Sequence, residues 1–255
     1  MPPERFPRFN VLDVGISAVQ IPDVIAQMEN WIHERAGCHY ISVTGMHGVV
    51  EAQHEPEFRS ILSAADLVVP DGMPLVWLAR WRGFALRRRV YGPDLMADFF
   101  SQSVARGYKH YLYGGAPGVA DRLAVALTKR FPGLAIVGTC SPPFGPPGKE
   151  EDERFVRDIN NSGADVVWIG LSGVTQDKWM FEHRDKLNVP VLVGVGAAFD
   201  FHSGRKKQAP LWMRESGFEW LFRLLQEPKR LWRRYLVYGS RFVYLVALEE
   251  LGWRR

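Results

Sequence analysis

Six short apolar runs, most of them with Gly, Pro or Asp at one end, constrain the fold of this 255-residue chain more than any other feature. They are rich in Val, Ile, Leu and Tyr and cover residues 40–43, 67–69, 110–113, 136–137, 166–169 and 191–195. Such runs are typical of parallel strands that are buried on both faces. Helical patterns separate them, among them residues 21–35, 117–131 and 150–160. This alternation predicts an α/β fold with a parallel sheet flanked by helices.

Residues 205–255, called the tail below, differ from the rest of the chain in charge and in pattern. They hold 12 Lys/Arg against five Asp/Glu, whereas residues 1–204 hold 20 against 23. Pro210 and Pro228 divide the tail into helical stretches, and no strand pattern follows them. We therefore expect a 1–204 core followed by a basic, all-helical appendage over 205–255. A basic segment on a slightly acidic body suggests a polyanionic partner, which is nucleic acid, an anionic membrane surface or a phosphate-rich ligand.

One stretch of the tail, residues 229–238, is amphipathic at about 3.6 residues per turn. Its apolar side holds Leu231, Trp232, Tyr235 and Leu236, and its opposite side holds Lys229, Arg230, Arg233 and Arg234. A narrow apolar face with aromatic residues beside a basic face is typical of a helix that lies in a lipid headgroup layer. A surface helix packed on the body, with solvated arginines, fits the same pattern. Residues 235–248 are interrupted by Gly239 and Arg241, so we do not expect them to span a membrane.

Polar and glycine-rich groups follow several predicted strands, at the edge where open parallel sheets bind their ligands. They include Thr44, Asp71, Gly114 with Gly115, Gln176 and Asp200. Asp71 fits a carboxylate that takes a proton from an attacking hydroxyl, and it also fits a simple Asp-Gly turn. The two glycines fit a phosphate-binding loop or a tight strand–helix turn. Asp200 fits an acceptor for a ribose hydroxyl or base N–H, or a helix N-cap.

Several catalytic patterns are absent from the sequence. No two aspartates lie two residues apart, so there is no DxD pair to hold a metal–diphosphate complex, and there is no HExxH or GxSxG. The two cysteines, Cys38 and Cys140, have no metal-ligand spacing and favour a reducing compartment. These absences argue against metal catalysis and serine hydrolysis, and we expect no cofactor. A leaving diphosphate would then need arginines to neutralise its charge, and the tail is rich in them.

Six long stretches, in order along the chain, resemble the WecG/TagA/CpsF glycosyltransferases. They are ADLVVPDGMPLVW from residue 65, RVYGPDLM from 89, YGGAPGVA from 113, WIGLSGVTQDKW from 168, VGVGAAFDFHSG from 193 and APLWMRESGFEWLFRLLQEPKRLWRRYL from 209. The resemblance runs from about residue 11 to residue 242. It implies a Rossmann-like core and an inverting, metal-independent transfer of a sugar from a UDP-sugar to an undecaprenyl-diphosphate-linked sugar. Such enzymes build cell-surface polysaccharides and lie peripherally on the cytoplasmic face of the bacterial plasma membrane.

The resemblance also implies roles for single residues. Asp71 would be the general base, and Thr44, Arg89 and Gln176 would complete the catalytic set. Nucleotide and diphosphate contacts would come from Gly114, Gly115, Asp200 and the tail residues Arg223, Arg230 and Arg233.

This chain departs from the family pattern at two positions. Met46 stands where the T-x-N motif has asparagine, and Val174 stands where a proline is usual. Without the amide at position 46, a plain hexose is an alternative donor sugar to an N-acetylmannosamine-like one. UDP-glucose and UDP-mannosaminuronic acid are therefore candidate donors. A non-catalytic module that binds membrane or nucleic acid is the alternative of another class, although we expect no nucleic acid partner. A homo-oligomer is a further candidate assembly.

Overall fold

The computed structural model describes residues 6–143, 145 and 147–253, which fall into two compact units. The first unit takes in Met1–Gln20, Thr44–Val90 and Gln208–Arg255. The second takes in Ile21–Val43 and Tyr91–Lys207. The first unit therefore joins the tail to segments from the first third of the chain. The boundary predicted between residues 204 and 205 stays a prediction.

All six predicted apolar runs are strands of one sheet, in the order β4-β3-β8-β7-β5-β6. The strands are β3 (His39–Thr44), β4 (Leu67–Pro70), β5 (Lys109–Gly114), β6 (Ala135–Cys140), β7 (Val166–Gly170) and β8 (Val191–Gly194). The pairings of β3 with β8, β8 with β7, β7 with β5 and β5 with β6 are all parallel. The predicted α/β class with a parallel sheet is confirmed.

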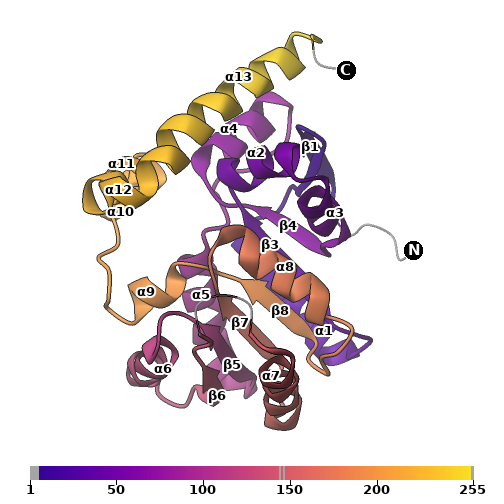
Figure 1. The fold of residues 1–255 in the computed structure, drawn as a ribbon, viewed down its shortest axis with the longest axis vertical. Coiled ribbons are helices and arrows are strands. Elements are labelled where there is room, and N and C mark those ends of the chain that lie inside the picture. The colour runs from indigo at the N-terminus through magenta and orange to yellow at the C-terminus, as the bar shows by residue number, and fades with distance from the viewer. Residues whose placement is uncertain (1–5, 144, 146, 254–255) are drawn as a thin grey trace. The chain divides into compact units, whose positions relative to one another are not determined.

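Helices cover both faces of the sheet in the second unit (Figure 1). They are α1 (Ile21–Glu34), α5 (Gly92–Arg106), α6 (Val119–Arg130), α7 (Lys149–Ser162), α8 (Gly173–His183) and the short α9 (Ala198–His202). Successive side chains of a strand point to opposite faces. His110 of β5 therefore meets Phe100 of α5, whereas Tyr113 meets Phe155 of α7 and Trp179 of α8.

The first unit begins with a hairpin that the sequence pattern did not reveal. Strands β1 (Arg8–Val11) and β2 (Val14–Ser17) pair antiparallel. Their two-residue turn is Leu12-Asp13, with φ of 51° and 62°, a backbone conformation usually taken by Gly or Asn. Helices α2 (Met46–His54), α3 (Pro56–Ala64) and α4 (Met73–Trp81) follow in this unit.

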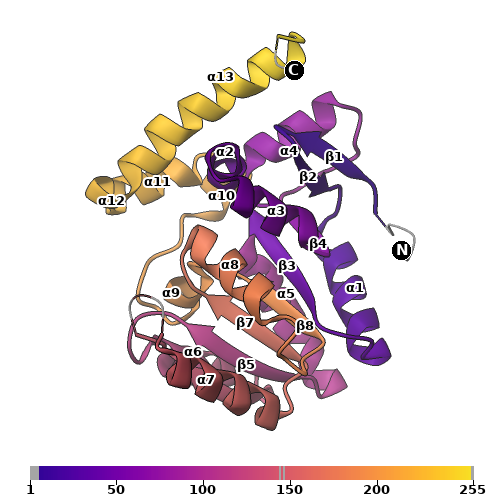
Figure 2. The ribbon, with the colours of Figure 1, turned by 45° about the vertical axis from the view of Figure 1, so that its right-hand side comes forward.

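The tail is helical, as predicted. It consists of α10 (Leu211–Glu215), α11 (Glu219–Gln226), α12 (Pro228–Trp232), a π-helical turn η1 (Arg233–Val237) and α13 (Tyr238–Glu250). Helix α13 lies beside α2 (Figures 1 and 2). Its far end is tied to the same unit by Arg82, which pairs with Glu249 at 2.7 Å and with Glu250 at 2.5 Å. Across the residues that the structure describes, none of the helices has the length and apolar character needed to cross a membrane.

We expect the sheet to depend on Leu112, which is fully buried in β5. Leu112→Ala leaves a cavity and should lower the free energy of unfolding by about 2–5 kcal/mol. Val125→Ala on α6 is the control, because Val125 is 69% exposed and its loss should change stability by no more than about 0.5 kcal/mol. Urea unfolding followed by circular dichroism measures both. Equal effects of the two substitutions would contradict the assignment of Leu112 to the core.

Candidate functional site

Asp71 lies directly after β4, where the chain leaves the sheet. Its backbone N–H donates to the carbonyl oxygen of Thr44, the last residue of β3, at 2.8 Å. The residue that follows Thr44 must be small, because a Cβ on Gly45 would lie 2.5 Å from the carbonyl oxygen of Asp71. Two predicted site residues, Thr44 and Asp71, are thus brought together by their backbones.

Arg89 is brought to Asp71 by the next segment of the chain. The Val90 N–H donates to the carbonyl oxygen of Pro70 at 2.9 Å, so the residues beside each of them are neighbours too. Arg89 Nη1 lies 4.0 Å from Asp71 Oδ1. Its Nη2 donates to the Glu219 carboxylate, which α11 of the tail supplies. A guanidinium therefore stands between two carboxylates, one from the strand end and one from the tail.

The Asp71 carboxylate is partly enclosed. Its Oδ1 is buried and accepts no hydrogen bond from the described residues, although 29% of the side chain as a whole is exposed. Burial raises the pKa of Asp71 above its ordinary value. The positive charge of Arg89 opposes that rise, and the negative charge of Glu219 adds to it. An oxygen that is enclosed but not hydrogen-bonded suits a group that must accept a proton from a bound molecule.

Two tail arginines add their charge to this carboxylate. Arg223 and Arg234 both act to lower the pKa of Asp71. Burial lowers the pKa of Arg234 itself, and the nearby charges of Arg223 and Arg230 do the same. The tail thus gathers positive charge around one carboxylate, and contact of Arg223 with a diphosphate stays a prediction. Arg234 had no predicted role there.

The predicted orientation of Arg234 is wrong. A regular helical wheel places Arg234 on the basic side. In the structure its side chain is half-buried and lies within reach of the charge of Asp71. Arg234 lies within η1, where the backbone takes the wider turn of a π-helix. The predicted apolar side is also split, because Leu231 is buried while Trp232 and Leu236 are about half exposed.

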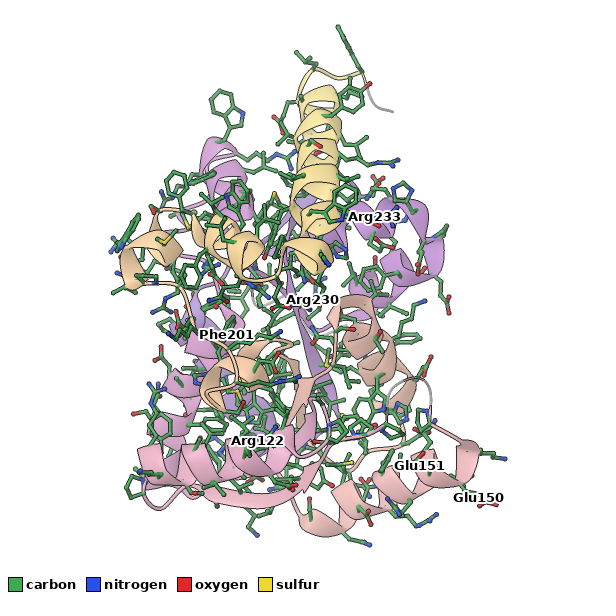
Figure 3. The ribbon with its side chains drawn as sticks, turned by 60° about the vertical axis from the view of Figure 1, so that its left-hand side comes forward. Arg122, Glu150, Glu151, Phe201, Arg230 and Arg233 are labelled. Atoms are coloured by element: carbon green, nitrogen blue, oxygen red, sulfur yellow. The ribbon has the colours of Figure 1, made fainter. Side chains whose placement is uncertain are left out.

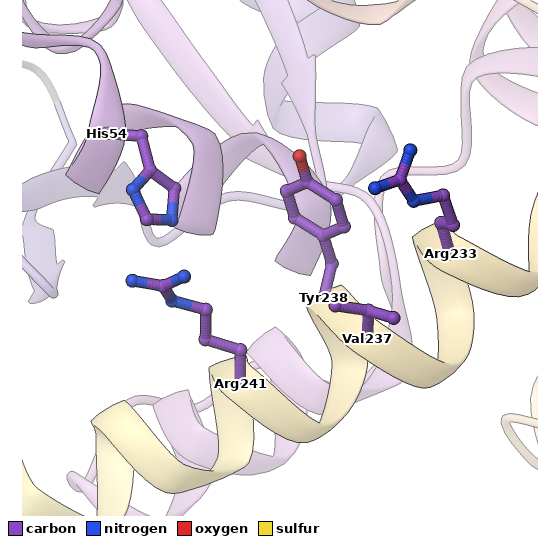
Figure 4. Close-up of a pocket in the computed structure, with 5 residues that line it drawn as sticks. All are labelled: His54, Arg233, Val237, Tyr238 and Arg241. Carbon is purple, nitrogen blue, oxygen red and sulfur yellow. The ribbon is translucent and has the colours of Figure 1, made fainter.

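Arg230 and Arg233 also belong to the tail, and Figure 3 labels both. Arg230 Nε pairs with Glu227 at 2.5 Å. Arg233 lines a cavity of about 300 Å³ together with His54, Val237, Tyr238 and Arg241. Figure 4 shows the side chains of Arg233, Tyr238 and Arg241 rising from the tail helix on the side of His54. Contacts of Arg230 and Arg233 with a diphosphate stay predictions.

In the second unit, predicted glycines gather where β5 and β7 end. A Cβ on Gly114, whose φ is +131°, would lie 2.6 Å from the backbone of Gly170. The Gly115 N–H is already used, because it donates to the Gly170 carbonyl oxygen at 3.0 Å. The ring of Phe199 leaves no room for a side chain at Gly170. The tight strand–helix turn is therefore present, and phosphate binding by Gly114 and Gly115 stays a prediction.

Gln176 and Asp177 lie buried at the start of α8. The Gln176 amide packs against Gly194, the last residue of β8, and its Oε1 is enclosed with no hydrogen-bond partner among the described residues. Burial raises the pKa of Asp177 to about 7, and a hydrogen bond with Ser42 of β3 opposes the rise. An enclosed amide oxygen at a strand end is suited to a hydroxyl or N–H donor on a ligand.

Asp200 lies inside α9, and Ala197 occupies the N-cap position, so the N-cap alternative for Asp200 is wrong. Its carboxylate pairs with Arg205 at 3.3 Å and with Lys206 at 3.0 Å. A nucleoside that bound Asp200 would share the carboxylate with these two cations. Its predicted nucleoside contact is not tested by the geometry.

Sequence reasoning missed two residues of this site, Glu219 and Arg234. The tail motif that carries the family resemblance contains both, but an isolated glutamate and one arginine among several give no signal of their own. Within the described part of the chain, no group of three or more His, Cys, Asp or Glu side chains could hold a metal ion. Independence from metal stays a prediction that activity assays must test.

Comparison with known proteins gives two kinds of match. A profile described as the glycosyl transferase WecG/TagA/CpsF family matches residues 9–255. An N-acetylglucosaminyldiphosphoundecaprenol N-acetyl-beta-D-mannosaminyltransferase of Bacillus spizizenii is 32% identical over 187 residues, which cover 73% of this chain and 70% of that protein. The protein of the same name from Bacillus subtilis is 26% identical over 209 residues, which cover 82% of this chain and 78% of the relative.

The raised pKa of Asp177 predicts a pH-dependent stability. Between the ordinary aspartate pKa near 4 and the folded value of about 7, the folded chain keeps a proton that the unfolded chain releases. The free energy of unfolding should therefore fall as pH rises through this range, by at most about 1.4 kcal/mol per pH unit. Asp177→Asn should flatten this slope in urea unfolding series from pH 4 to pH 8.

The exposed Asp185 supplies the control for this series, since it is 94% exposed. Asp185→Asn should follow the wild-type curve. A curve for Asp177→Asn that runs parallel to the wild type over the whole range would show that Asp177 ionises normally.

Proposed function

Because this chain belongs to the WecG/TagA/CpsF family of glycosyl transferases, we propose that it moves a sugar from a UDP-sugar to an undecaprenyl-diphosphate-linked sugar. The sugar is a hexose or an N-acetylhexosamine of the N-acetylmannosamine kind. The names of the two Bacillus relatives, which transfer N-acetylmannosamine to N-acetylglucosaminyldiphosphoundecaprenol, support the acceptor class. The product enters cell-surface polysaccharide synthesis.

The observation that carries this proposal is the Asp71 carboxylate with its enclosed oxygen and its surrounding arginines. Asp71 accepts the proton of the acceptor hydroxyl while the hydroxyl oxygen attacks the anomeric carbon of the donor. The bond between that carbon and the diphosphate oxygen breaks, and its electron pair leaves with UDP. A single displacement of this kind inverts the anomeric centre. General-base assistance contributes about 10²–10⁴-fold to such a step.

The departing UDP carries negative charge, and guanidinium groups stabilise it without a metal ion. Arg223 and Arg234 supply positive charge near Asp71, and Arg230 and Arg233 provide further cations on the tail. Thr44 and Gln176 contact the sugar. Gly114 and Gly115 hold the phosphates, and Asp200 accepts from the nucleoside. Full activity in EDTA supports this assignment, and activity that vanishes with EDTA and returns with Mg²⁺ or Mn²⁺ refutes it.

The identity of the donor sugar is a separate part of the proposed function. Met46 offers no amide to hydrogen-bond an N-acetyl group. UDP-glucose and UDP-mannosaminuronic acid are therefore the alternative donors. A panel of these UDP-sugars and UDP-N-acetylmannosamine, with a short-chain lipid-diphosphate acceptor, separates them by kcat/KM. The family membership argues against a non-catalytic binding module.

The tail also provides the membrane contact in this proposal. Most of the large apolar side chains that the described part of the chain exposes belong to it, including Trp212, Leu225, Trp232, Leu236 and Tyr244. Exposed apolar side chains beside basic ones favour an anionic bilayer surface over plain solvent. A peripheral position on the membrane brings the enzyme to a lipid-linked acceptor.

Asp71→Asn should lower kcat by about 10²–10⁴-fold, because the amide cannot take the proton. The variant should keep the wild-type circular dichroism spectrum, and its affinity for UDP in calorimetry should change less than twofold. Asp158→Asn on the exposed side of α7 is the matched control and should leave kcat unchanged. If kcat of Asp71→Asn is within threefold of the wild-type value, Asp71 is not the general base.

Leu236→Glu should reduce binding to phosphatidylglycerol vesicles by about tenfold or more, because it replaces an exposed apolar tail residue by a charge. Sedimentation with the vesicles measures the bound fraction. Val125→Glu changes an exposed apolar residue on α6, 69% exposed against 53% for Leu236, and should bind as the wild type does. If the two variants lose binding equally, or if the wild type does not bind, the tail does not contact the membrane.

A further inference from the structure

Glu219 is a buried acid that the reaction scheme above leaves without a role. It begins α11, it is only 5% exposed, and its carboxylate accepts from Nη2 of Arg89. Burying a carboxylate is costly unless it is paired and hydrogen-bonded. Here the Arg89 guanidinium, which also lies 4.0 Å from Asp71 Oδ1, supplies that pairing.

Arg89 has two carboxylates within reach and bonds closely to one of them. Its Nη2 touches Glu219, whereas its Nη1 stays 4.0 Å from Asp71 Oδ1, which is beyond hydrogen-bond distance. The Asp71 oxygen that faces Arg89 has no hydrogen-bond partner among the described residues. Arg89 therefore donates a hydrogen bond to Glu219 of the tail, and it donates none to Asp71 Oδ1.

We propose that Glu219 is a positioning residue that holds Arg89 off Asp71 and so keeps the Asp71 carboxylate free to take a proton from the acceptor. This inference rests on the proposed function. A guanidinium that closed on Asp71 would form a direct charge-assisted pair with it. Such a pair occupies the oxygen that must receive the proton and makes the carboxylate a weaker base.

The other charges around Asp71 agree with this role. Arg89, Arg223 and Arg234 all favour its ionised form, and among the described residues Glu219 is the acid whose charge acts against them. Without Glu219, three cations would act on a carboxylate that already has an enclosed oxygen. Glu219 thus keeps the Asp71 carboxylate basic, although that carboxylate lies among the cations that a leaving diphosphate needs.

The test is Glu219→Gln, which keeps the side-chain shape and removes the charge. Arg89 is then free to pair with Asp71, and both changes lower the pKa of Asp71. In full-length protein without substrates, the ¹³Cγ titration of Asp71, assigned by its absence in Asp71→Asn, should move to lower pH by about one unit. In the transfer assay, the acidic limb of the profile of kcat against pH should move the same way, with a plateau about tenfold lower.

Glu215→Gln is the matched control. Glu215 is a tail glutamate that pairs with Arg88 at 3.0 Å, but both side chains are exposed. Removing its charge should leave the Asp71 titration and the pH profile unchanged. If Glu219→Gln lowers kcat while the titration midpoint of Asp71 stays in place, Glu219 is merely structural and the proposal is overturned.

Should Glu219→Gln fail to fold by circular dichroism, Glu219→Asp carries the test. Its charge is retracted by one methylene, so Arg89 is released in part and the Asp71 midpoint should fall by less than one unit. An unchanged midpoint overturns the proposal. Because the titration needs no substrate, a shifted midpoint in a protein that transfers no sugar would refute the proposed function and leave the role of Glu219 intact.

Discussion

The candidate site depends on one ion-pair arrangement, a guanidinium held between two carboxylates from distant parts of the sequence. Arg89 reaches Asp71 through the backbone pairing of Val90 with Pro70, and it reaches Glu219 because the tail packs within the same unit. Neither carboxylate would be stable in this setting without neighbouring positive charge. The tail is therefore part of the electrostatic environment of Asp71 as well as a basic surface.

This arrangement reconciles two demands on the same place. A leaving diphosphate needs several cations to neutralise its charge. A general base among those cations must keep a pKa high enough to accept a proton. In the proposed reaction, Arg223 and Arg234 serve the first demand, and the burial of Asp71 together with the nearby charge of Glu219 serves the second. The basicity of Asp71 depends on which carboxylate Arg89 hydrogen-bonds. A small shift of the Arg89 side chain from Glu219 toward Asp71 would therefore lower the pKa of Asp71.

The sheet was predictable because its signal is local. Each strand is a short apolar run, and Thr44, Asp71 and Gly114 lie where those runs end, whereas the roles of Thr44 and Gln176 came from the family resemblance. The β1–β2 hairpin was not predictable, since its turn uses Leu12 and Asp13 where Gly or Asn would have marked it. The half-buried position of Arg234 and the pairing of Glu219 both depend on tertiary packing, which a helical wheel does not contain.

The π-helical turn has a consequence for how the tail tolerates change in length. A π-helical turn accommodates about one residue more than an α-helical turn does, and each residue of a regular helix rotates the chain by about 100°. Loss of a single residue from Arg233–Val237 would therefore restore regular winding and leave the helix beyond it at nearly its present heading. Phe242 would keep its buried position, and Glu249 and Glu250 would still reach Arg82. This segment should thus tolerate the loss of one residue better than the regular helix α13, where a deletion rotates every later side chain by about 100°.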